Sequence, residues 1–267
     1  MCIISRNSLK QKLMIKSLMI LIYKPLGLTP LQALENLKKQ KLKLSSEVLS
    51  YAGRLDPMAE GLILVLVGDE NKKRREFERL DKEYEFEAIL GIETDSYDLL
   101  GIPKIGKEIN ISTTQINSFI KKNIPKTLQK YPPYSAFKIK GKPLYYWTRR
   151  GVKIDIPKRE IEVKKLKLID RYTISPEKFS DEIITRINLV KGDFRQKEIL
   201  NEWKAFFKEN KKESFDVLKF SFRCSSGGYV RSLVDSLGEK LGTKAVTFSI
   251  KRVKIGSFNI KEAVFLT

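Results

Sequence analysis

One acidic residue, Asp56, lies in a turn-forming motif whose composition suits a rigidly held carboxylate. The motif Gly-Arg-Leu-Asp-Pro-Met-Ala-Glu-Gly occupies residues 53–61. Glycine at both ends gives the backbone freedom, and Pro57 restricts Asp56 to an extended or turn conformation. The apolar run 62–67 that follows is typical of a buried strand. A carboxylate at a strand entrance can act as a nucleophile or an electrostatic anchor, although the same residues taken alone also fit an ordinary surface turn.

The elements that would position this carboxylate are both strands and helices, so the sequence predicts an α+β fold. The apolar run 18–23 is predicted to form the first strand. Residues 84–90, 161–163 and 220–224 alternate apolar and polar side chains, which is typical of half-buried strands. In this interpretation Tyr84 begins its strand.

Two helices can be placed from their capping and periodic residues. Residues 29–32, Thr-Pro-Leu-Gln, contain the elements of a capping box and predict a helix that ends before Leu44. Its apolar face is expected at Leu31, Leu34 and Leu37. The second helix carries apolar residues at positions 230, 233, 234, 237 and 241 and is followed by a glycine at 242, which puts Arg231 in its first turn.

Residues 176–215 are predicted to be an insertion that contains an added helix. Its apolar stripe lies among charged residues and comprises Ile199, Leu200, Trp203, Phe206 and Phe207. A stripe of this kind indicates core packing rather than an RNA-binding site.

The charge balance indicates a polyanionic partner. The chain of 267 residues is 42% hydrophobic, as in a globular protein, and its formal net charge is +20. Basic clusters at 72–75, 149–150 and 164–165 occur together with aromatic residues at 84 and 145–147. Rings that stack on bases and cations that bind phosphate suit RNA, whereas a merely soluble surface is the simpler interpretation of the charge alone.

The absence of histidine excludes imidazole acid–base chemistry and the commonest transition-metal ligand. Two cysteines, Cys2 and Cys224, are too few for a metal cluster and are typical of reduced thiols in the cytoplasm. The run 18–23 is too short for a membrane span and lacks a cleavage site. We therefore expect a cytoplasmic protein without a bound metal.

Five further motifs occur around the Asp56 motif in a fixed order. They are Tyr-Lys-Pro-Leu-Gly-Leu-Thr-Pro at 23–30, Lys-Glu-Tyr at 82–84, Gly-Ile-Glu-Thr-Asp-Ser-Tyr-Asp at 91–98, Pro-Tyr-Ser-Ala-Phe-Lys-Ile-Lys-Gly-Lys-Pro-Leu-Tyr at 133–145 and Gly-Tyr-Val-Arg-Ser-Leu-Val-Asp-Ser-Leu-Gly at 228–238. Together the motifs resemble the TruB family, the tRNA pseudouridine-55 synthases, from about residue 23 to about residue 258.

The resemblance implies a fold, a domain organisation and a substrate. The fold is expected to be that of the pseudouridine synthases, with a mixed, mostly antiparallel central sheet flanked by helices and loops. Residues 1–20 are expected to be a tail and the start of the first strand, and residues 21–267 a single catalytic domain without the C-terminal PUA domain of many relatives. The expected activity is isomerisation of uridine 55 in the T-stem-loop of tRNA, by a monomer without a cofactor or an obligate protein partner.

The resemblance also implies site residues. Asp56 matches the catalytic aspartate, which attacks either uracil or the sugar; Tyr84 matches the tyrosine that stacks on the uracil, and Arg231 the arginine that pairs with the aspartate. Lys24, Lys72 and Tyr229 match positions that line the site, where the two lysines are expected to bind phosphate. Tyr51 occupies the position of a histidine that fills the space of the flipped base, and Arg54 replaces a small or uncharged residue.

Two alternatives fit parts of this pattern. Gly-Arg-Leu-Asp is also the usual catalytic motif of ribosomal-RNA pseudouridine synthases of the RluA or RsuA kind. A non-catalytic tRNA-binding or tRNA-folding protein would keep the fold and the charge, but it would not require a carboxylate near phosphates.

Overall fold

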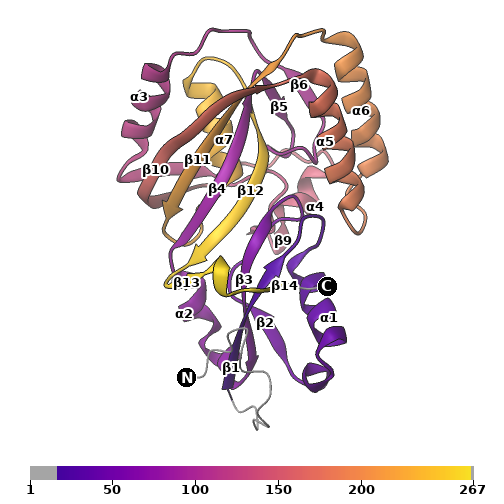
Figure 1. Ribbon diagram of the computed structural model, residues 1–267, viewed down its shortest axis with the longest axis vertical. Coiled ribbons are helices and arrows are strands. Elements are labelled where there is room, and N and C mark those ends of the chain that lie inside the picture. Colours follow the sequence, from indigo (N-terminus) through magenta and orange to yellow (C-terminus); the bar gives the residue numbers. More distant parts are fainter. Residues whose placement is uncertain (1–16, 266–267) are drawn as a thin grey trace.

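The computed structural model describes residues 17–265 (Figure 1). Most of the expected N-terminal tail, residues 1–20, and Cys2 lie outside this range. The strands are β1 (Ser17–Lys24), β2 (Leu49–Tyr51), β3 (Glu60–Gly68), β4 (Lys82–Leu90), β5 (Ile92–Thr94), β6 (Pro103–Ile105), β7 (Lys126–Lys130), β8 (Lys138–Ile139), β9 (Lys142–Pro143), β10 (Lys158–Ile174), β11 (Phe215–Cys224), β12 (Ala245–Ile255), β13 (Phe258–Asn259) and β14 (Val264–Phe265).

Helices connect these strands. The α-helices are α1 (Pro30–Gln40), α2 (Arg74–Arg79), α3 (Thr113–Asn123), α4 (Leu144–Thr148), α5 (Pro176–Leu189), α6 (Gln196–Glu209) and α7 (Val230–Lys240). Short 3₁₀ turns are η1 (Leu42–Leu44), η2 (Asp69–Lys73) and η3 (Ile260–Glu262).

A ten-stranded mixed sheet forms the centre of the molecule. Its main strand order is β14-β1-β3-β12-β4-β11-β10-β7, with β2 paired to β3 and β13 to β12. The β1–β14 and β12–β3 pairs are parallel, and the other pairs in this sheet are antiparallel. The prediction of a mixed, mostly antiparallel sheet with flanking helices is therefore confirmed.

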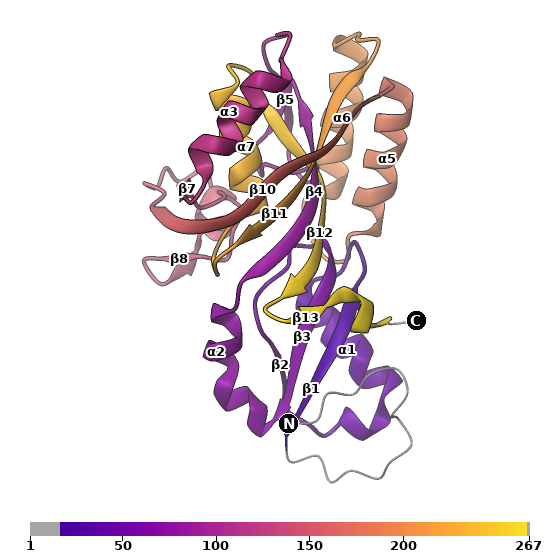
Figure 2. The ribbon, with the colours of Figure 1, turned by 60° about the vertical axis from the view of Figure 1, so that its left-hand side comes forward.

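Helices cover both faces of this sheet. In Figure 2, α3 and α7 lie on one side of the upper sheet, and α5 and α6 lie on the other. One core cluster joins buried residues of α1, α3 and α7 to the sheet, and a second joins α5 and α6 to the opposite face. Strand β3 is buried on both faces between its ends, which explains why residues 62–67 are continuously apolar rather than alternating.

Most local predictions agree with these elements, and three need correction. The Thr29 capping box, the strand at 62–67 and the position of Arg231 in the first turn of α7 are confirmed. Leu31 is not on the buried face of α1 but is 60% exposed, because the face against the sheet instead includes Ala33. Strand β4 begins at Lys82, two residues before Tyr84. The segment 176–215 holds two helices rather than one.

The apolar stripe within residues 196–209 packs in the core, as predicted. Ile199, Trp203 and Phe206 of α6 are buried in the second core cluster, with Leu200 and Phe207 partly buried against it. The additional helix, α5, contributes Phe179, Ile183 and Ile187 to the same cluster.

Candidate active site

The turn that carries Asp56 joins β2 to β3, and a buried arginine on the interior side holds it in place. Arg252 of β12 is 1% exposed. It donates hydrogen bonds to the carbonyl oxygens of Leu62 (2.8 Å), Arg54 (2.8 Å) and Gly53 (3.4 Å). Gly61 adopts a φ of +115° and packs directly on the Arg252 backbone, where a Cβ atom would collide. Asp56 is therefore presented by a turn whose carbonyl groups are held by a single guanidinium.

Arg231 meets the Asp56 carboxylate from the first turn of α7. Its Nε donates to Asp56 Oδ2 at 2.8 Å, and Nη1 and Nη2 donate to the carbonyl oxygens of Ser96 (2.9 Å) and Tyr134 (3.4 Å). The Arg231 side chain is 3% exposed, whereas that of Asp56 is 35% exposed. The arginine thus supports the pair from the interior, and the carboxylate is the member of the pair that solvent can reach.

A second carboxylate, Asp98, completes this charge cluster. Its Oδ2 lies 3.6 Å from Arg231 Nε, and Ser96 Oγ donates to Oδ1 at 2.8 Å. Burial raises the pKa of Asp98, and Arg231 opposes that shift. Burial tends to lower the pKa of Arg231, but attraction to Asp56 and Asp98 outweighs it, so the net shift is upward. The guanidinium is therefore charged and shared between two carboxylates.

Tyr84 lies in the sheet close to this cluster. It is 8% exposed, and its ring stacks on Phe222 with a centroid separation of 6.2 Å. Burial raises the pKa of Tyr84 to about 12, although the neighbouring Arg252 lowers it. Asp56 also contributes to this shift, so the phenol and the carboxylate are close enough to interact. At neutral pH Tyr84 is an uncharged phenol that can donate a hydrogen bond.

Lys24 is the site residue for which the structure requires a correction. Its side chain is fully buried, and Nζ donates to the carbonyl oxygens of Pro25 (3.0 Å) and Leu28 (2.7 Å). A direct phosphate contact does not fit this burial. Burial lowers the pKa of Lys24 to about 7, with attraction to Asp56 opposing the shift, so the residue belongs to the electrostatic environment of the carboxylate rather than to the surface.

The other four predicted substrate-binding residues do not all lie near the turn, because η2, which carries Lys72, follows the end of β3 that is farthest from Asp56. Tyr229 directly precedes α7. Burial raises the pKa of Tyr229, Asp56 also raises it and Arg54 lowers it, so both charged residues lie near the phenol. Arg54 itself is exposed, and Tyr51 is half-buried at the end of β2 with the Arg74 guanidinium 5.5 Å from its ring centroid. Lys72 is exposed on η2 and paired with Asp69 at 2.7 Å. Their contacts with RNA remain predictions.

A pocket of about 330 Å³ opens beside Asp56, within the size range of ligand sites. It is lined by Asp56, Pro57, Met58, Ser96, Asp98, Leu100, Tyr134, Tyr145, Arg149, Asp193, Phe194, Arg195 and Arg231. Tyr84, Tyr229 and Lys72 do not line it. Asp98 and Tyr134 belong to the sequence motifs but had no predicted role in the site, and residues 193–195 were not predicted to contribute to it.

Two further findings apply to the described residues. Between residues 17 and 265, no group of three or more carboxylate, thiol or imidazole side chains could hold a metal ion. Over the same range, no helix has the length and apolar character needed to cross a bilayer.

Comparison with solved structures supports the class of fold. The chain matches "Crystal Structure of a Cbf5-Nop10-Gar1 Complex" with a TM-score of 0.58 at 17% identity, covering 94% of this chain and 52% of that one. It matches "Structure of H/ACA RNP bound to a substrate RNA containing 2'-deoxyuridine" with a TM-score of 0.55 at 17% identity, covering 94% and 51%. The chain thus spans about half the length of these solved chains and shares their fold.

Sequence comparison identifies the family. The family described as "TruB family pseudouridylate synthase (N terminal domain)" matches residues 39–193. Proteins named "tRNA pseudouridine synthase B" from Lactobacillus acidophilus and Fusobacterium nucleatum are 32% and 29% identical, over 93% and 91% of this chain and 71% and 69% of theirs. The chain belongs to the TruB family, and the resemblance that its motifs indicated is confirmed.

Proposed function

We propose that this protein isomerises the T-loop uridine at position 55 of tRNA to pseudouridine. The observation that carries this proposal is the Asp56–Arg231 pair: a partly exposed carboxylate, held at 2.8 Å by a buried guanidinium, at the wall of a nucleotide-sized pocket. Membership of the TruB family and the names of the curated relatives support the same reaction.

The chemistry requires that a base be detached, rotated and rejoined through carbon without escaping. Asp56 is proposed as the nucleophile, towards either the uracil ring or the sugar C1′, because it is the carboxylate of the cluster that solvent reaches. Arg231 supplies the counter-charge of Asp56 and fixes its orientation. Asp98 is too deeply buried for the same role and instead balances the charge of Arg231.

Tyr84 is proposed to pack against the uracil and to act on the final proton. Its raised pKa makes it a hydrogen-bond donor before substrate binds, so removal of a proton would require the bound intermediate to change its environment. A uridine stacked in a folded loop must also be flipped out, at an energetic cost of a few kcal/mol. Tyr51 is proposed to fill the space that the base leaves.

The chain's +20 charge supports docking of tRNA through phosphate contacts. We propose that the protein acts as a cytoplasmic monomer without a cofactor.

The decisive experiment incubates purified protein with a T-stem-loop transcript and a ribosomal-RNA transcript, without added metal or nucleotide, and maps pseudouridine in both. We expect product at the T-loop uridine alone. Product found only in ribosomal RNA would overturn the substrate assignment, and binding without product in any RNA would favour a non-catalytic role.

A further inference from the structure

The loop between α5 and α6, residues 190–195, is built as a fixed structure. The Gln196 side chain donates to the carbonyl oxygens of Val190 (3.1 Å) and Gly192 (2.6 Å) and accepts from the Phe194 amide (2.8 Å). The Lys191 amide donates to the Gly27 carbonyl at 3.0 Å. One side chain thus closes the loop, and a backbone bond ties it to the rest of the fold.

That backbone bond leads to the catalytic turn. The Gly27 amide donates to the carbonyl oxygen of Pro57 at 2.9 Å, directly after Asp56 in the chain. Gly27 has a φ of +88° and packs against the backbone of Leu189, where a side chain would collide. The end of α5, the segment after β1 and the Asp56 turn therefore form one connected unit.

The α5–α6 loop supplies a wall of the pocket beside Asp56. Asp193, Phe194 and Arg195 line the pocket together with Asp56 and Arg231. Phe194 is only partly buried against the neighbouring core cluster. An aromatic ring with a free surface in a nucleotide-sized pocket can pack against a base or a sugar.

Arg195 is fixed in place but retains hydrogen-bonding capacity. Its Nη2 donates to Asp95 Oδ2 at 2.9 Å, and its guanidinium lies 4.7 Å from the ring centroid of Tyr134. Its side chain is 21% exposed. The bond to Asp95 uses one of five N–H groups, and the carboxylate of Glu198 is at the longer distance of 3.8 Å.

A second cation is attached to the same loop. Arg149 Nη2 donates to the Asp193 carbonyl at 2.7 Å, and its Nη1 lies 3.6 Å from Asp193 Oδ2. Arg149 and Arg195 therefore both face the pocket. An anionic backbone that approaches Asp56 needs such cations, because the carboxylate alone would repel it.

We propose that Phe194 and Arg195 bind substrate, so that the α5–α6 pair extends the site in addition to packing on the sheet. Phe194 forms an apolar wall for a sugar or a neighbouring base, because Tyr84, the proposed partner of the uracil, does not line this pocket. Arg195 binds an adjacent phosphate. This inference rests on the proposed function, because it assigns contacts to the same substrate.

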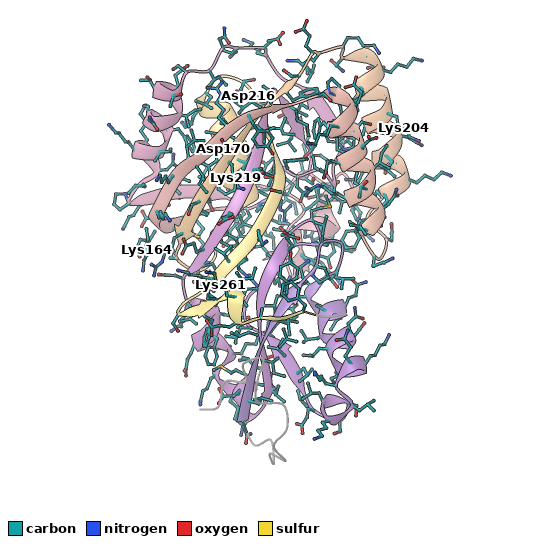
Figure 3. The ribbon with its side chains drawn as sticks, viewed as in Figure 1. Lys164, Asp170, Lys204, Asp216, Lys219 and Lys261 are labelled. Atoms are coloured by element: carbon teal, nitrogen blue, oxygen red, sulfur yellow. The ribbon has the colours of Figure 1, made fainter. Side chains whose placement is uncertain are left out.

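Steady-state kinetics on a T-stem-loop transcript test the proposal with three variants. Arg195→Gln removes the charge but retains an N–H donor for Asp95, and Phe194→Ala removes the ring. Lys204→Ala is the matched control, because Lys204 is an exposed cation on α6 (Figure 3) and does not line the pocket. Thermal unfolding of each variant reports whether the fold is retained.

For Arg195→Gln we expect KM to rise about 10-fold or more with kcat little changed, as for loss of a charge-assisted hydrogen bond. The slope of log(1/KM) against log salt should become shallower by about 0.7 to 0.9, as for one lost phosphate contact. For Phe194→Ala we expect KM to rise about 5-fold or more, as for one lost stacking contact, with an unchanged salt slope. Lys204→Ala should behave as the wild type.

Wild-type KM and salt slope in both loop variants would overturn the inference while leaving the proposed function standing. A lower kcat and melting temperature in Arg195→Gln, with an unchanged salt slope, would show that Arg195 only supports Asp95 and would also overturn it. An inactive wild-type protein would instead show that the proposed function had failed, and the inference with it.

Discussion

Replacement of Arg231 by methionine isolates the energetic role of the buried guanidinium. Arg231→Met keeps an unbranched side chain but removes the guanidinium, which leaves Asp98, which is 5% exposed, without its counter-charge. It also leaves the carbonyl oxygens of Ser96 and Tyr134 without their donor. Asp56 is accessible enough to be hydrated, so its loss of the partner contributes little to stability.

The expected loss of unfolding free energy is about 3–5 kcal/mol, the typical effect of removing one partner from a buried ion pair. Such a loss is a large fraction of the roughly 5–15 kcal/mol that stabilises most domains. It should also depend on pH. Burial already raises the pKa of Asp98, and removal of Arg231 raises it further, so the folded variant binds a proton that the unfolded chain releases at about pH 4. The loss of unfolding free energy in Arg231→Met, referred to below as the deficit, must therefore grow as pH increases.

Urea unfolding of the wild type, Arg231→Met and the double variant Arg231→Met/Asp98→Asn at pH 5 and pH 8 measures these quantities. We expect the deficit of the single variant to be larger at pH 8 by at least about 1 kcal/mol, since one pKa unit corresponds to about 1.4 kcal/mol. The double variant should recover much of the stability and most of the pH independence. A deficit below about 1 kcal/mol, or one equal at both pH values, would refute the assignment of Arg231 and Asp98 as a coupled buried pair.

Three further outcomes follow from individual side chains. Asp56→Asn should abolish pseudouridine formation and leave tRNA affinity within a few-fold, as measured by product mapping and filter binding; retained activity would remove Asp56 from the mechanism. Burial lowers the pKa of Lys24 to about 7 from 10.5, so between these two pH values the unfolded chain holds a proton that the folded chain has released. The contribution of Lys24 to stability therefore rises with pH over that range. Lys24→Met should flatten that part of the stability profile in denaturant titrations, and an unchanged slope would contradict the shift. Trp203→Ala should reduce the unfolding free energy by about 3–5 kcal/mol, whereas Lys204→Ala should change it by less than about 0.5 kcal/mol; comparable effects would contradict the core role of α6.

Sequence patterns predicted helices and strands correctly where residues within a few positions determine the structure. The Thr29 capping box and the helical spacing around Arg231 depend on neighbours within a few residues, and both are confirmed. The second helix of the insertion was also detectable, because Ser175 caps it, Pro176 opens it and Phe179, Ile183 and Ile187 follow at intervals of four.

The site depended on contacts that local patterns do not encode. Asp56 and Arg231 are 175 residues apart, and only the resemblance to a family linked them. The resemblance implied that Lys24 binds phosphate, yet its side chain is buried and donates to the carbonyl oxygens of Pro25 and Leu28. The position of Arg195 depends on how the α5–α6 pair packs against the sheet, which composition does not specify.

The place of β12 in the sheet has a consequence for biosynthesis. This strand lies between β3 and β4, although it follows both by more than 150 residues of chain. In a nascent chain that ends before β12, one edge of β3 and one edge of β4 have no partner strand. Unpaired strand edges promote mispairing and aggregation. Because the guanidinium that holds the Asp56 turn also comes from β12, these hydrogen bonds can form only after that strand has been translated.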